Sequence, residues 1–146
     1  MNHSFLLFFL FSAFVWTACS SGDDKSPETT PADQSISEQV DALIDADKYE
    51  EALDLLNSEV ETPEIVALKE KTHLNYGIYT VYQSDPSAMR ENANKGLREF
   101  IAVLTINPQN QKARSEIDQI VGIYKSMNRA PEPDVAESLK AFGYEF

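Results

Sequence analysis

The chain of 146 residues has little of what most catalytic and metal sites need. It contains one cysteine, Cys19, and two histidines, His3 and His73, and its five glycines form no glycine-rich loop. A single cysteine cannot form an internal disulfide, and this set is too small for the common zinc, nucleophile and phosphate-binding motifs. We therefore expect a protein that is not an enzyme, with no catalytic residues, no metal and no cofactor.

Positive charge is also scarce, and the excess of acid is confined to one third of the chain. The sequence has 12 Lys and Arg against 24 Asp and Glu, a net charge of −12. Residues 20–64 hold 14 acids and 2 bases, whereas residues 65–146 hold 10 of each. Nucleic acids and anionic lipid headgroups demand clusters of Lys and Arg, so we expect no nucleic-acid partner. The imbalance favours a basic protein partner, and the simpler alternative is that the acids only solvate the surface.

No apolar run is long enough to span a membrane, which takes about 20 helical residues. The run from Phe5 to Trp16 has 12 residues, the length of the hydrophobic region of a signal peptide. It leads into Trp16-Thr-Ala-Cys19, which resembles the lipobox of bacterial lipoproteins, where the cysteine is lipidated and becomes the first residue. The resemblance implies a signal peptide over residues 1–18 and a lipid on Cys19. The alternative is ordinary cleavage near Ala18, which would release a protein with one free thiol.

Residues 19–34 are rich in Ser, Thr, Pro and Asp and contain no large apolar side chain. Such a segment cannot bury enough surface to offset the entropy of ordering, so it predicts a disordered acidic tether. Ser20 after the cysteine resembles lipoproteins that many Gram-negative bacteria release to the outer membrane. The prediction for localisation is a lipid-anchored protein of the bacterial cell envelope, with the outer membrane favoured over the inner.

From residue 35 the sequence predicts helices. A capping box, Ser35-x-x-Glu38, precedes an apolar segment of helical period, and Thr62-Pro63 and Asp85-Pro86 are further helix starts. No stretch alternates with the period of a strand, so residues 35–146 predict an all-α domain of about six helices in three antiparallel hairpins. In the fourth helix the residues predicted to face inward are Met89, Ala93, Gly96, Leu97, Phe100 and Leu104. Gly96 is expected where the third and fourth helices cross closely.

Two segments resemble tetratricopeptide repeats. Phe100 to Ala113 looks like the join between one repeat and the next, and Asp47 to Leu53 looks like the turn and second-helix start of another. These repeats also have a small residue followed four positions later by a larger apolar one. This pair occurs twice here, as Ala52/Leu56 and as Gly96/Phe100. The resemblance implies a right-handed array of hairpins in which the first helix of each hairpin faces a concave groove.

The predicted third helix carries two stripes of side chains. Ala67, Leu74, Ile78 and Val81 form the stripe predicted to be core. The candidate partner-binding residues, which the resemblance places in the groove, are Lys69, Thr72, His73, Tyr76 and Tyr79. Aromatic rings beside a base and hydrogen-bonding groups suit a peptide or an acidic chain end. The alternative is that Tyr76 and Tyr79 pack on the first hairpin, because long apolar helices in small domains are usually buried on two sides.

Two functions remain open from the sequence. The first is a lipid-anchored adaptor or scaffold that binds another envelope protein through its helical surface without catalysis. The second is a structural or ligand-carrier protein of the envelope that acts through a cavity between the hairpins.

Overall fold

The structure is a computed structural model that describes residues 34–146. These residues form six α-helices and one 3-10 turn. The bounds are α1 Ile36–Asp45, α2 Tyr49–Ser58, α3 Pro63–Tyr82, η2 Pro86–Ala88, α4 Met89–Ile106, α5 Gln111–Ser126 and α6 Pro133–Lys140. The all-α prediction is confirmed. The signal peptide, Cys19 and nearly all of the predicted tether lie outside the described residues.

The helix ends follow from local chemistry. The Ser35 and Glu38 capping box is formed at the start of α1, and the Thr62 hydroxyl accepts from the Ile65 amide at the start of α3. Asp47 after α1 and Asn128 after α5 have φ of 58° and 52°. In both places the next amide bonds back to a carbonyl in the last helical turn, the Schellman arrangement that ends a helix. These signals depend on few neighbours, so the sequence located the helices well.

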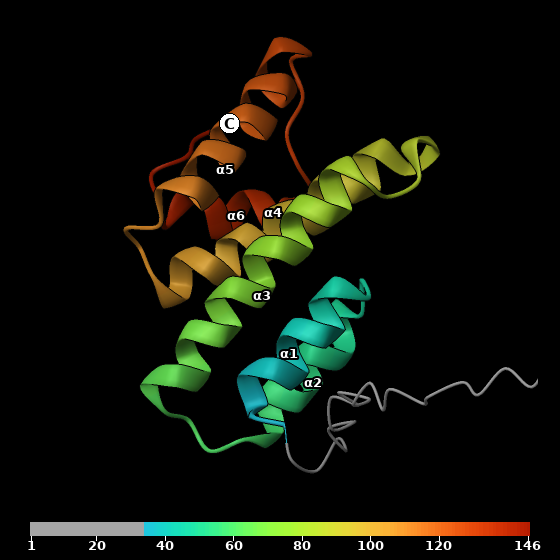
Figure 1. Cartoon of the computed structure of the whole chain (residues 1–146). Helices are drawn as coiled ribbons and strands as arrows, with labels where there is room; N and C mark the ends of the chain where they lie inside the picture. Colours follow the sequence, from blue (N-terminus) through green and yellow to red (C-terminus); the bar gives the residue numbers. More distant parts are fainter. Residues whose placement is uncertain (1–33) are drawn as a thin grey trace, which may run out of the picture.

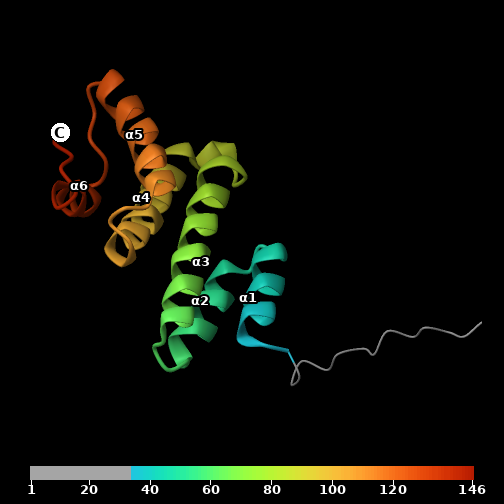
Figure 2. The ribbon, with the colours of Figure 1, turned by 60° about the vertical axis from the view of Figure 1, so that its left-hand side comes forward.

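The helix α3 connects two hydrophobic cores. The hairpin α1–α2 packs on one face of α3 around Val40, Leu56 and Leu68, while α4 packs on another face and in turn contacts α5 and α6. Figures 1 and 2 show α3 as a long green helix with α1 and α2 on one side and α4 beside its upper part. A helix buried on two sides cannot present one open stripe, so its side chains divide between two interfaces.

Two glycines let α3 and α4 cross closely, and the prediction for Gly96 is confirmed. A Cβ on Gly96 would collide with a methyl of Val81 and would lie 3.4 Å from the carbonyl oxygen of Gly77. A Cβ on Gly77 would lie 2.6 Å from the ring of Phe100, which is fully buried. Carbon atoms pack best about 3.5–4.0 Å apart, so neither site has room for a side chain.

Three predictions need correction. Helix α6 does not lie antiparallel beside α5: it packs on α4, and Figure 2 shows it nearly end-on where α5 is seen from the side. Met89, predicted to face inward, is 72% exposed because it starts α4 at the turn, beyond the core. Ala67 is exposed, while Leu74, Ile78 and Val81 of the same stripe pack on the second core. The packing of the six helices does not confirm the predicted tetratricopeptide-like array.

Polar side chains also tie the second core together. Glu116 on α5 is buried, accepts a hydrogen bond from the Tyr82 hydroxyl at 2.6 Å and pairs with Lys112 at 2.6 Å. The bond to Glu116, together with burial, raises the pKa of Tyr82 to about 12. Arg98 on α4 pairs with Glu132 and Asp134, which fixes the start of α6 on α4. Within residues 34–146 no helix is both long and apolar enough to cross a bilayer.

Candidate functional site

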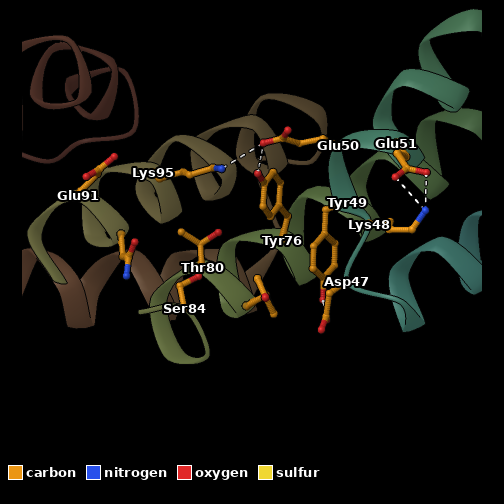
Figure 3. Close-up of a pocket in the computed structure, with 12 residues that line it drawn as sticks. Asp47, Lys48, Tyr49, Glu50, Glu51, Tyr76, Thr80, Ser84, Glu91 and Lys95 are labelled. Atoms are coloured by element: carbon orange, nitrogen blue, oxygen red, sulfur yellow. Dashed lines mark hydrogen bonds and ion pairs between the residues drawn. The ribbon is translucent and has the colours of Figure 1, made fainter. Parts of the chain in front are cut away.

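A cleft of about 490 Å³ opens where the first hairpin meets the α3–α4 pair. Its wall combines the turn before α2, the second half of α3 and the first half of α4. Figure 3 shows side chains from all three segments converging on it. The lining residues include Asp47, Lys48, Tyr49, Glu50, Glu51, Tyr76, Tyr79, Ser84, Glu91 and Lys95. The cleft therefore brings together residues that lie more than 40 positions apart in the chain.

Three tyrosines form one side of the cleft. The rings of Tyr49 and Tyr76 are stacked, with centroids 5.1 Å apart and planes 9° apart. Tyr79 packs on Tyr49 at 5.2 Å with a tilt of 42°. Tyr49 and Tyr76 are each 7% exposed, so the cluster serves as core between α2 and α3 as well as wall. The wall is rigid because its rings are held by packing.

A charged network caps this wall. The Tyr76 hydroxyl donates to Glu50 Oε1 at 2.5 Å, and Lys95 Nζ donates to the same oxygen at 3.2 Å. The Lys95 ammonium also lies 4.7 Å from the centre of the Tyr76 ring, a cation–π distance. Figure 3 shows Glu50 and Lys95 meeting above Tyr76. The network links α2, α3 and α4 at a single carboxylate.

The network shifts the pKa values of its members. The hydrogen bond from Tyr76, followed by Lys95, lowers the pKa of Glu50. Burial, followed by the bond to Glu50, raises the pKa of Tyr76. The Tyr76 hydroxyl and Glu50 raise the pKa of Lys95 against the effect of its burial. At neutral pH the network therefore holds an ionised carboxylate, a protonated phenol and an ammonium.

The mouth of the cleft is acidic. Four carboxylates line it, from Asp47, Glu50, Glu51 and Glu91, against two ammonium groups, from Lys48 and Lys95. Both ammonium groups are already paired, Lys48 with Glu51 at 3.0 Å and Lys95 with Glu50 at 3.2 Å. Glu91 is exposed and forms no ion pair within residues 34–146. An incoming cationic group would meet uncompensated negative charge beside an aromatic wall.

The structure separates the five predicted binding residues. Tyr76 and Tyr79 line the cleft, and they also pack on the first hairpin, as the alternative expected. Thr72 is fully buried and bonds to the carbonyl oxygen of Leu68, so it lines no groove. His73 Nδ1 contacts Glu99 Oε2 on α4 at 2.8 Å, and Lys69 does not line this cleft. The groove expectation is wrong for Thr72 because α3 is covered on two faces.

Sequence reasoning missed Tyr49, Glu50 and Lys95, which complete the cleft. Tyr49 and Glu50 follow the turn after α1, and only the packing of that turn on α3 brings them to Tyr76. Lys95 could have been found from the sequence. It directly precedes Gly96, where α4 was expected to cross another helix closely, and a residue beside such a crossing lies near the neighbouring helix.

The described residues offer no metal centre. No group of three or more His, Cys, Asp or Glu side chains in residues 34–146 is arranged to hold a metal ion. Comparison of the chain with protein-family models, with curated proteins and with solved structures gives no match.

Proposed function

We propose that the helical domain is a non-catalytic adaptor that binds a basic segment of another envelope protein in the cleft between α2, α3 and α4. The observation that carries this proposal is the acidic mouth over a wall of packed tyrosines. Preformed aromatic walls bind peptides with little ordering cost, and Tyr is among the residues enriched at protein interfaces. The carboxylates would select Lys or Arg in the bound segment and speed its association.

The adaptor proposal includes an anchor at the envelope. The lipobox-like residues before Cys19 support a lipid there, and the preference for the outer membrane depends on Ser20 and on the nearby Asp23 and Asp24. A lipid chain alone binds membranes weakly, and stable anchoring needs two acyl groups, as on a lipidated N-terminal cysteine. The polar residues 20–34 would then let the domain reach partners near the membrane.

The cleft is tested by site-specific photocrosslinking in cells that make the native protein. A photoreactive amino acid at Ser84, which lines the cleft, should give an adduct with a discrete envelope protein, whereas the same group at Gln119, exposed on α5, should not. Charge reversal by Glu91→Lys should remove most of the Ser84 adduct. Glu137→Lys, the matched reversal on α6, should leave it unchanged. Equal adducts at Ser84 and Gln119, or an adduct indifferent to Glu91→Lys, would refute binding in this cleft.

The anchor is tested by Cys19→Ala. The expected result is an unprocessed precursor, or a domain that leaves the detergent-extracted membrane fraction, because no helix within residues 34–146 is long and apolar enough to hold the domain in a bilayer. Fractionation and the mass of the isolated protein measure both outcomes. A Cys19→Ala protein that is processed and retained like the natural one would show that Cys19 carries no anchoring lipid.

A further inference from the structure

A second cleft, of about 290 Å³, lies at the connected end of the α3–α4 hairpin against the last turns of α5. Val81, Ala93 and Ile120 contribute to its wall from three helices. Met89, Ile123 and Met127 also line it, and they are 72%, 58% and 51% exposed. Single exposed apolar side chains are ordinary, but several gathered around one concave site indicate a binding surface. Methionine adapts its shape to such ligands.

Two arginines border this apolar cleft. Arg90 and Arg129 both line it, and neither forms an ion pair within residues 34–146. The neighbouring Arg98, by contrast, is paired with two carboxylates. A guanidinium is weakly hydrated and binds a carboxylate through two parallel hydrogen bonds. The chain has a net charge of −12, so two arginines that lie beside apolar side chains and form no ion pair within residues 34–146 stand out as a candidate anion-binding pair.

Tyr124, which lines the cleft, carries a buried hydroxyl that has no hydrogen-bond partner among residues 34–146. The residue is 4% exposed. Arg90 and Asn94 lie near enough to oppose the rise that burial causes in the pKa of Tyr124, yet neither completes a hydrogen bond of good geometry with Oη. Buried hydroxyls are nearly always paired, so a water molecule or the polar group of a ligand would complete the bonding of Oη.

We propose that this cleft binds the monomeric anion of a long-chain fatty acid, with the alkyl chain against the apolar wall and the carboxylate at Arg90 and Arg129. The volume lies at the lower end of sites for a single small ligand, so it suits one alkyl chain better than a partner helix. Two arginines match one carboxylate, whereas an anionic membrane surface requires a larger basic cluster. The site shares no lining residue with the adaptor cleft, so the two proposals stand or fall separately.

The test uses the full chain in neutral phosphatidylcholine vesicles with a photoactivatable palmitate analogue. The adduct should map by mass spectrometry to peptides containing Met89, Ile123 or Met127. Excess palmitate should abolish labelling. Hexadecanol has the same alkyl chain without the charge, so it should compete about tenfold less well than palmitate. This factor is the effect of losing one charge-assisted hydrogen bond. A photoactivatable phosphatidylglycerol in the same vesicles should not label these peptides.

The variants change exposed residues, so a loss of labelling reflects lost binding and not unfolding of the domain. The double change Ile123→Glu and Met127→Ser should remove labelling, and Arg90→Gln with Arg129→Gln should lower it about tenfold. Two matched controls should label normally: Val60→Ser, an apolar residue 80% exposed near α3, and Lys140→Gln on α6. Unchanged melting curves confirm that each variant folds. Labelling that survives both double variants, or equal labelling by phosphatidylglycerol, overturns the fatty-acid site.

Discussion

Replacing Gly77 with leucine is expected to lower the free energy of unfolding by about 2 kcal/mol or more, although leucine is the better helix former by up to about 1 kcal/mol. The new Cβ would lie 2.6 Å from the ring of Phe100, and both residues are buried where α3 crosses α4. An aromatic ring enclosed on all sides cannot rotate away, so the helices must separate, and overpacking of this kind costs about 1–3 kcal/mol and occasionally more. Denaturant melts measure the change directly.

The chain supplies a matched control for this substitution. Gly122 is also inside a helix, α5, but a Cβ there would meet nothing within 4 Å. Gly122→Leu should therefore raise stability by up to about 1 kcal/mol, since only the helix propensity changes. The two glycine variants should move the midpoint in opposite directions. If Gly77→Leu stabilises the domain as Gly122→Leu does, then α3 and α4 do not cross closely at Gly77.

Truncating Tyr76 to alanine is expected to cost about 3–5 kcal/mol, the usual effect of removing a buried aromatic side chain. The ring stacks on Tyr49 at 5.1 Å and forms the contact through which the first hairpin packs on the middle of α3. Domains of this size are stable by only about 5–15 kcal/mol in total, so the variant should lose a large share of its stability and melt at a clearly lower temperature. Thermal melts followed by circular dichroism test this result.

Tyr76→Phe separates the ring from its hydroxyl. It keeps the stack on Tyr49 and removes only the hydrogen bond to Glu50, so the expected loss is about 1 kcal/mol. Leu74→Ala provides a second reference on the other face of α3, where the side chain packs on the second core. A Tyr76→Ala protein as stable as Tyr76→Phe would show that the ring is not part of the core, and the first hairpin would then be only loosely attached.

The sequence alone determined the helices and most of their ends. The capping box at Ser35 and the Thr62-Pro63 start each depend on contacts within a few residues, so one chain is enough to predict them. Gly96 was identified as a close helix contact for a similar reason: a glycine four positions before a large apolar residue, inside an amphipathic helix, is typical of a helix crossing. The acidity of the first third of the chain was also visible directly, and part of it lies around the cleft.

Only the tertiary structure decided which face of each helix is open. The period of α3 predicts two stripes, but not that the first hairpin covers one face of the helix while α4 covers another. The cleft and the separation of Thr72 and His73 from Tyr76 follow from that packing. So do the exposure of Met89 and the packing of α6 on α4. Local signals fix the backbone within an element because they act over one or two turns, whereas the choice between groove and core depends on residues such as Tyr49 and Tyr76, which meet only after the helices dock.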